Sequence, residues 1–555
     1  MGPTDVTSEE LVIEDLDHLG LVAGVVDQIG LVECIDARLG THEDEHLSAG
    51  QVLKAMILNG LGFVSAPMYL FSRFFEDKPT EHLLGEGVRP AHLNDDKLGR
   101  VLDSLHEAGL SSLFVEIASE AISRLGVDAG QLHLDATSFH LHGRYPGQRE
   151  EQGHNNAIGG VVLEEGEPEP IRIRRGYSRD HRPDLRQFVV DLMCSGDGGI
   201  PLFFRAADGN DSDAASFASL ICEFRAQVNI QTLFVADAAL YTQHNLRSLQ
   251  KLRWVSRVPQ TLNEARALLE ETDEQSFRFS SREGYRVAEM SNDYAGVAQR
   301  WVIVASQARQ ERLRPQLDKK LDTEHTRALR ELRKVRRRRF ACEADARQEL
   351  EQLEEGLRFH RLENVEVSSE AYHTRRGRPS KGAVPNYLYR ITAELMREEE
   401  AIERARSRAG RFVLATNVVD EEELCAEEVL EAYLEQGVVE RGFKFLKDPM
   451  FFADSVFLNS PRRVAALAMV MGLCLLVYGL GQRMLRRSLD EREEHIPDQK
   501  GKPTQRPTLR WVFQLFQAVH LVWMGAAQQI VGLNEERKHI LEFFSPQCRR
   551  YYLLS

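Results

Sequence analysis

The segment from Tyr433 to Lys447 carries residue types at a spacing that suits phosphate chemistry. If the segment forms a helix, Tyr433, Glu440 and Lys447 share one stripe, because seven residues make almost two turns. Gln436 and Lys444 fall beside that stripe. A carboxylate held between a phenol, an amide and lysines suits a metal ligand whose substrate carries phosphate groups. The same pattern fits a solvated helix face with pairs four residues apart, so the segment alone leaves both interpretations open.

Two aspartates upstream, each at the end of an apolar strand-like run, extend this pattern. Asp135 follows residues 132–134, and Asp237 follows residues 233–236. Active-site carboxylates of α/β sheets tend to lie at strand ends, although either Asp alone commonly marks a turn or a helix cap. Three neighbouring carboxylates repel one another, and a hard divalent cation such as Mg²⁺ removes that repulsion. Two such ions about 4 Å apart can activate the attacking oxygen and stabilise the leaving oxygen of a phosphodiester.

The periodicity around these acids predicts a mixed α/β core. The expected strands cover residues 131–141, 186–195, 200–210, 231–240 and 253–259, with helices over 212–226 and 241–252. A long interruption follows, with short strands and a charged helix from about Arg309 to Leu357. Residues 411–419 return as a strand, and residues 427–447 follow as one helix.

The flanking regions read as helical. Residues 1–128 show apolar positions at three- and four-residue spacing, with Ser48 and Asn94 as plausible N-caps. The last stretch is helical after a polar break at 488–506. We therefore expect an N-terminal helical domain over 1–128, an α/β core over 129–261 and 411–487, an α+β insertion domain over 262–410, and C-terminal helices over 488–555.

In these features the chain resembles the DDE transposases of bacterial insertion sequences, and specifically the superfamily with the signature Tyr-x2-Arg-x3-Glu-x6-Lys. Here the signature reads Tyr433, Gln436, Glu440 and Lys447. The interruption between Asp237 and Glu440 matches the insertion domain of that superfamily. Residues 176–185 and 209–210 also resemble blocks that lie between its first two acids. The resemblance implies that residues 129–261 and 411–487 form an RNase H-like catalytic core, interrupted by the insertion domain, and that the N-terminal helical domain over 1–128 binds DNA.

The resemblance also implies roles for individual residues. Asp135, Asp237 and Glu440 would be catalytic and would bind two Mg²⁺ ions, for which Mn²⁺ can substitute. Tyr433 and Lys447 would hold phosphates of the transposon end. Gln436 departs from the signature, because an amide offers hydrogen bonds but neither the charge nor the bidentate fork of Arg.

Arg441 or Lys444 would compensate for Gln436 as a DNA contact. The implied partners are the terminal inverted repeats of the element and the target DNA, with a homodimer in the synaptic complex. The same acids would also serve an RNase H-fold nuclease, and a transposase-derived DNA-binding protein that no longer cuts is a further alternative.

Composition bounds these interpretations without deciding among them. The 555 residues exceed one ordinary core, and 43% hydrophobic with 28% charged residues is typical of a folded globular protein. The net charge of −15 does not favour a nucleic-acid partner, but bases concentrate at 307–340, 374–381 and 441–447. The seven cysteines form no CxxC motif, and the N-terminus lacks a signal-peptide pattern. We expect a cytoplasmic, nucleoid-associated protein.

Two basic runs are ambiguous. Residues 376–379 read Arg-Gly-Arg-Pro, which resembles the core of an AT-hook, so Arg376 and Arg378 are candidate minor-groove contacts. A loop between two strands is the alternative. The run from Lys334 to Arg339 lies late in the charged helix and fits a phosphate-binding face or a solvated one equally.

Two apolar features are expected to be structural. The run from Val464 to Leu480 has no charged residue, but its 17 residues are at the lower limit for a membrane span, and we expect no membrane association. A buried helix explains the run as well. Trp254 lies in an apolar strand, where a core role is favoured over stacking on a base.

Overall fold

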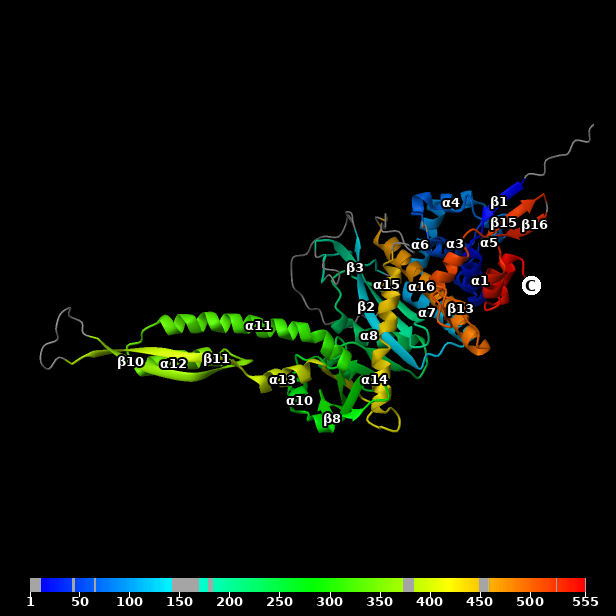
Figure 1. Cartoon of the computed structure of the whole chain (residues 1–555). Helices are drawn as coiled ribbons and strands as arrows, with labels where there is room; N and C mark the ends of the chain where they lie inside the picture. The colour runs from blue at the N-terminus through cyan, green and yellow to red at the C-terminus, as the bar shows by residue number, and fades with distance from the viewer. Residues whose placement is uncertain are drawn as a thin grey trace, which may run out of the picture. The chain divides into compact units, whose positions relative to one another are not determined.

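The computed structural model describes residues 11–41, 45–63, 66–141, 169–177, 182, 184–372, 384–448, 458, 460–525 and 527–554 (Figure 1). The chain forms two compact units. The core unit comprises Met1–Ser256, Tyr294–Val297 and Glu431–Ser555, and the insert unit comprises Arg257–Asp293 and Ala298–Leu430. Each unit is built around its own strands and helices.

The core unit contains the predicted mixed sheet, which confirms the α/β fold class. Its strands lie in the order β4-β3-β2-β5-β6. The bounds are β2 (Gln131–Leu141), β3 (Arg186–Ser195), β4 (Pro201–Ala207), β5 (Leu233–Ala236) and β6 (Arg253–Arg257). β2, β3 and β4 pair antiparallel, whereas β2, β5 and β6 pair parallel. The parallel strands require crossover connections, which α8 (Asp213–Gln227) and α9 (Gln243–Ser248) supply.

Both faces of this sheet are covered by helices, as parallel strands require. On one face, the Phe203 ring of β4 lies 6.1 Å from that of Phe224 in α8, which in turn lies 6.4 Å from Phe234 of β5. On the other face, the Phe204 ring lies 5.6 Å from that of Phe114 in α7 (Leu110–Leu125). Successive residues of β4 therefore point to opposite faces, as strand geometry dictates. Trp254 of β6 is fully buried, which confirms its predicted core role.

The longest helix of the core unit, α16 (Pro461–Arg492), lies on the α7 side of the sheet. It packs against α1 (Leu19–Ile29), α3 (Ala49–Leu61), α6 (Asp95–Glu107) and α7, and two of its arginines form ion pairs. Arg463 donates two hydrogen bonds to Asp103 of α6, and Arg483 donates two to Asp197 after β3. In the described part of the chain, α16 alone is long and apolar enough to cross a bilayer, and 89% of its most apolar window is buried inside the protein. That burial favours the core-helix interpretation of residues 464–480.

The N-terminal region is helical as predicted, apart from its first element. Its helices are α1 (Leu19–Ile29), α2 (Leu31–Leu39), α3 (Ala49–Leu61), η1 (Met68–Leu70), α4 (Phe71–Phe74), α5 (Thr80–Leu84), η2 (Pro90–His92), α6 (Asp95–Glu107) and α7. Ser48 and Asn94 accept hydrogen bonds from the backbone N–H three residues on, which confirms both predicted N-caps. The first described residues, however, form a strand, β1 (Leu11–Asp15).

The C-terminal region corrects the prediction of continuous helix. Residues 520–531 form a hairpin of β15 (His520–Met524) and β16 (Ala527–Val531), and β15 pairs antiparallel with β1. The region also contains β13 (Ile496–Pro497), β14 (Pro503–Thr504), α17 (Leu509–Leu515), α18 (Glu535–Leu541), α19 (Pro546–Arg549) and η4 (Arg550–Tyr552). β15 is a strand because it pairs with β1, which comes from the opposite end of the chain. No local sequence pattern indicates that pairing.

The insert unit has its own strands and helices. Its strands lie in the order β12-β9-β8-β7. The bounds are β7 (Arg278–Phe279), β8 (Tyr285–Tyr294), β9 (Val297–Ser306) and β12 (Arg411–Thr416), with α10 (Asn263–Glu271), η3 (Glu274–Ser276) and α13 (Glu399–Ala409). The single charged helix expected up to Leu357 is in fact two, α11 (Gln307–Arg337) and α12 (Glu343–Glu355), and an antiparallel hairpin of β10 (His360–Tyr372) and β11 (Asn386–Arg397) follows.

Candidate functional site

The first two predicted acids lie side by side at one level of the core sheet. The parallel ladder between β2 and β5 ends with the pair Leu134 and Ala236, and Asp135 and Asp237 are the next residue on each chain segment. Neighbouring strands are about 4.8 Å apart, so this register brings the two residues to the same level of the sheet. Asp237 follows the end of β5, whereas β2 continues to Leu141, so the prediction that Asp135 lies at a strand end is wrong. The structure thus brings together two residues that lie 102 positions apart in the sequence.

Local hydrogen bonds fix the backbone at both positions. Oδ1 of Asp135 accepts a hydrogen bond of 2.8 Å from the N–H of Ala136, and Oδ1 of Asp237 accepts one of 2.8 Å from the N–H of Ala239. The Ser256 hydroxyl of β6 donates to the Asp237 carbonyl at 2.8 Å. The turn after β5 is therefore held from both sides.

Asp135 faces the side of the sheet that α7 and α16 cover. Its direct partner across β3 is Leu192, and the partner of Leu192 on β4 is Phe204, which packs against α7. Residues directly opposite one another in an antiparallel pair share a face. By the same alternation, His133 and Phe139 of β2 lie on the face of Asp135. Any third ligand must come from a helix on this side.

The helix that carries Glu440, α15 (Gly437–Leu446), packs on β2 and on α16, which places it on this side of the sheet (Figure 1). Just before α15, Glu435 lies beside Gly196 and His133, because a Cβ placed on Gly196 would lie 3.2 Å from Oε2 of Glu435 and 3.5 Å from Nε2 of His133. At its other end, Nζ of Lys447 lies 5.6 Å from the centroid of the Phe139 ring. The segment therefore runs along β2 from His133 toward Phe139.

These two contacts set the level of Glu440 along β2. From Glu435 to Lys447 a helix rises roughly 18 Å, and from His133 to Phe139 a strand rises roughly 20 Å, so the two segments have nearly the same length. Glu440 lies nearly halfway along the helical segment and is thus level with Asp135. The structure brings Glu440 to the level of the two aspartates, on a different element. Its side chain is exposed and lies in the first turn of α15, where the helix dipole favours an anion.

The helix predicted over 427–447 is interrupted, which corrects the proposed stripe. α14 (Ala426–Leu434) ends before Gln436, and α15 begins at Gly437, with no side-chain cap from Gln436. Tyr433 therefore belongs to the preceding helix, and only Glu440 and Lys447 keep the predicted relation along α15. A glycine in a helix interior costs about 1 kcal/mol relative to alanine, so Gly437 weakens the continuous alternative.

The donor set fits a hard divalent cation in its chemistry. Carboxylate oxygens are the ligands that Mg²⁺ prefers, and within the described residues neither Asp237 nor Glu440 has a basic partner within 4.0 Å. The three acids do not form a closed ligand set, because no group of three or more His, Cys, Asp or Glu among the described residues is close enough to hold a metal ion. Asp135 and Asp237 follow the same pair of the parallel ladder, whereas Glu440 lies on a separate helix.

Cations on α15 border a second feature, which we call the basic pocket. This cavity of about 310 Å³ lies between α15, α16 and α17 and is lined by Arg441, Lys444, Arg486 and Arg510. Arg510 pairs with Asp448 at 2.6 Å, whereas in the described part of the chain neither Arg441 nor Lys444 has an acidic partner within 4.0 Å. Burial lowers the pKa of the Arg486 guanidinium, and the nearby Arg506 and Arg441 act in the same direction. The pocket thus concentrates positive charge beside the helix that carries Glu440.

His133 is a site residue that the sequence reasoning missed. Its side chain is fully buried, and burial lowers its pKa to about 4, so the ring is neutral at pH 7. Neither ring nitrogen has a hydrogen-bond partner among the described residues. The signal was present in the sequence, because His133 precedes Asp135 by two residues on a strand and must share its face.

The two ambiguous basic runs have different outcomes. Arg376 and Arg378 lie outside the described residues. In the run from Lys334 to Arg339, Lys334 pairs with Glu331 at 2.8 Å, Arg336 donates to the Ala393 carbonyl, and Arg338 pairs with Glu349 at 2.9 Å. These contacts give part of that run a structural role within the insert unit.

Comparison with known proteins adds three findings. Residues 130–477, more than half of the chain, match the transposase DDE domain family, and residues 11–119 match DUF4277, a domain of unknown function. No curated protein matches the chain. Among solved structures, a cryo-EM structure of the piggyBac transposase synaptic complex with hairpin DNA aligns at a TM-score of 0.36 and 11% identity, over 100% of this chain and 86% of that one.

Proposed function

The chain belongs to the transposase DDE domain family and is a transposase, and on that premise we propose that it cleaves DNA at the ends of its own insertion sequence and transfers the strands to target DNA. Asp135, Asp237 and Glu440 act as the metal ligands. The observation that carries this assignment is the register of β2 and β5, which places two of the three acids next to each other. The level of Glu440 along β2 supports the third.

Two Mg²⁺ ions, for which Mn²⁺ can substitute, would supply Lewis-acid stabilisation of the attacking and leaving oxygens when bound. Asp135 and Asp237 are positioned by the sheet, and Glu440 by α15. Water attacks the phosphorus at the transposon end, and the bond to the 3′ oxygen breaks to leave a free 3′-hydroxyl. That hydroxyl then attacks a target phosphodiester, and a 3′ oxygen of the target leaves, so this second step forms one phosphodiester bond as it breaks another. No covalent protein–DNA intermediate is required.

The cationic residues of α15 and its neighbours hold the DNA backbone in this proposal. Lys447 extends over Phe139 on the acid-bearing face of β2, and Tyr433 and Gln436 lie just before α15. Arg441 and Lys444 line the basic pocket on the α16 side. Phosphates on both flanks of Glu440 would thus meet a cation. The partners are the terminal inverted repeats and target DNA, with two copies of the chain in the synaptic complex, in the nucleoid of the cytoplasm.

Cleavage of the DNA that flanks the gene tests this function. Purified full-length protein is incubated with Mg²⁺ or Mn²⁺ and a labelled duplex carrying the inverted repeats. We expect cuts at the repeat ends that disappear in Asp237→Asn and Glu440→Gln, whereas Glu536→Gln, an exposed acid of α18, cuts as wild type does. Binding of the repeats without cutting would exclude the enzyme in favour of a DNA-binding role. Cutting without preference for the repeats would indicate a nuclease.

A further inference from the structure

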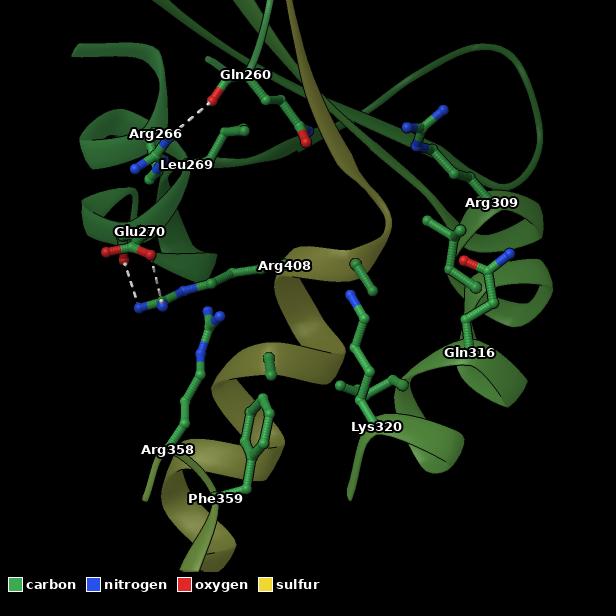
Figure 2. A pocket seen from close by; sticks show the side chains of 14 residues that line it. Gln260, Arg266, Leu269, Glu270, Arg309, Gln316, Lys320, Arg358, Phe359 and Arg408 are labelled. Atoms are coloured by element: carbon green, nitrogen blue, oxygen red, sulfur yellow. Dashed lines mark hydrogen bonds and ion pairs between the residues drawn. The ribbon is translucent and has the colours of Figure 1, made fainter. Parts of the chain in front are cut away.

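The insert unit contains a cavity that the DDE chemistry does not use. It has a volume of about 560 Å³, within the range of small-molecule sites, and is enclosed by α10, α11, α13 and the segment just before β10 (Figure 2). Leu269 and Phe359, each only 6% exposed, form apolar parts of its wall. We call this cavity the insert pocket.

The insert pocket has a large excess of positive charge. Five of its lining residues are cationic, and one, Glu270, is acidic. Glu270 pairs with Arg408 at 3.3 Å. Within the described residues, neither Lys320 nor Arg358 has an acidic partner within 4.0 Å. The remaining cations are Arg266 and Arg309.

The orientation of these side chains points to a ligand rather than to a solvated surface. In Figure 2, Lys320 of α11 and Arg358 extend into the hollow with their charged ends toward Arg408. The Arg358 guanidinium also lies 5.3 Å from the centroid of the Phe359 ring, which restricts its orientation. Within the described residues, Lys320 and Arg358 have no acidic partner within 4.0 Å, so their like charges repel each other and an anion in the hollow would reduce that repulsion.

The cavity continues along α11. A second hollow of about 490 Å³ shares Gln316 and Lys320 with the insert pocket and adds Lys319 and Arg327. Its acid, Glu324, is engaged with His360 at 2.9 Å. Lys320 therefore stands between two adjoining cationic hollows. A single small anion would occupy one of them, whereas a chain of phosphates can occupy both.

We propose that the insert pocket and the adjoining hollow bind consecutive backbone phosphates of a nucleic-acid strand. Guanidinium groups match phosphate oxygens in pairs, and the lysine ammonium acts as a point charge between successive phosphates. The choice of DNA as the source of these phosphates rests on the proposed function. The site itself does not depend on the DDE acids.

The test measures DNA binding in the absence of divalent metal, so that cleavage plays no part. Lys320→Gln and Arg358→Gln are compared with Arg314→Gln, which removes the same charge from an exposed position of α11 outside both hollows. We expect about three- to tenfold weaker binding of a repeat-containing duplex for each pocket variant, and a shallower dependence of log K on log salt by roughly 0.9 per lost contact. Affinities equal to that of Arg314→Gln would overturn the proposal.

A thermal-unfolding measurement with sodium triphosphate distinguishes DNA from a free phosphate compound as the ligand of the pocket. If sodium triphosphate raises the midpoint of thermal unfolding of wild type but not of Lys320→Gln, while DNA affinity is unchanged in both pocket variants, the pocket serves a small polyphosphate and the DNA assignment is wrong. Failure of the transposase function would appear differently, as loss of cutting at the repeats by wild type with metal. The binding series still decides the insert pocket in that case, because all three variants retain the acids.

Discussion

Asp135 and Asp237 occupy equivalent positions on neighbouring parallel strands, each one residue beyond the pair Leu134 and Ala236. This relation holds although the two residues lie 102 positions apart in the sequence, because parallel pairing of β2 and β5 fixes the level of both strands at once. The sheet therefore preorganises two of the three proposed metal ligands before metal or DNA binds.

The first prediction follows from this relation. Asp135→Asn should reduce cleavage by more than about a hundredfold, because loss of a direct ligand costs more than the 10- to 100-fold loss that follows from changing an outer partner. Binding of the repeats without metal should be unchanged, as the side chain is a ligand and not a phosphate contact. Single-turnover cleavage and fluorescence anisotropy measure the two effects. Cleavage within tenfold of wild type would remove Asp135 from the site.

The second prediction concerns the metal. Because the described residues contain no closed set of three or more ligands, metal affinity without DNA should be weak. Millimolar Mg²⁺ should then barely raise the midpoint of thermal unfolding, since the stabilisation is RT ln(1 + [L]/Kd). With repeat DNA bound, the same Mg²⁺ should give a clear further rise, and Glu440→Gln should abolish that rise. A large stabilisation by Mg²⁺ without DNA would show that the site closes unaided.

Gln436 is the subject of the third prediction. Arg at this position restores the family signature Tyr-x2-Arg-x3-Glu-x6-Lys just before α15 and adds a charged, bidentate donor. Gln436→Arg should therefore tighten binding of the repeat ends by about three- to tenfold, with a steeper salt dependence. Gln436→Lys adds the charge without the fork and should recover only part of the gain. Unchanged affinity in both variants would show that position 436 does not meet a phosphate.

The core strands were predictable because each has a local signal. Residues 131–141 alternate in hydrophobicity and residues 186–195 are a mostly apolar run, and the structure places β2 and β3 at these bounds. The acids at the ends of apolar runs were likewise visible. The sequence pattern could not predict the distance between Asp135 and Asp237, because that distance depends on which strands pair. The level of Glu440 depends on tertiary contacts of Glu435 and Lys447 with β2.

Two of the wrong predictions show the limits of local helix and strand propensity. An apolar run such as residues 519–524 fits a helix or a strand equally, and the partner that decides is β1, about 500 residues earlier. The break between α14 and α15 reflects a weak helix former, Gly437, whose small cost becomes decisive only in a tertiary setting. Pairing with β1 outweighed the local propensity of residues 519–524, and the helix-weakening effect of Gly437 was underestimated.

The fourth prediction is a dependence of stability on pH. Burial lowers the pKa of His133 to about 4, from about 6.5 in an unfolded chain. Above pH 6.5 neither state is protonated and the residue has no effect. As the pH falls toward 4, the unfolded chain binds a proton that the folded chain does not, so stability falls, by an amount approaching about 3 kcal/mol. Urea unfolding at several pH values measures this loss.

His133→Phe provides the comparison for that measurement. It should reduce the loss between pH 6.5 and 4 without removing it, because His18 is also buried with a pKa lowered to about 4 and contributes in the same window. His18→Phe should remove a similar share. An identical pH dependence in His133→Phe and wild type would show that the His133 ring is accessible to protons in the folded protein.

The fifth prediction uses opposite charge changes within the basic pocket. Arg441→Gln removes a cation that has no acidic partner among the described residues and should weaken binding of the repeat ends by about three- to tenfold. Asp448→Asn removes the carboxylate that pairs with Arg510 at 2.6 Å and should strengthen binding. Arg487→Gln, on the same helix as Arg486 but paired with Glu491 outside the pocket, is the matched control and should behave as wild type. A pocket that only stabilises the fold would lose stability with Asp448→Asn and gain no affinity, so the sign of that one change separates phosphate binding from packing.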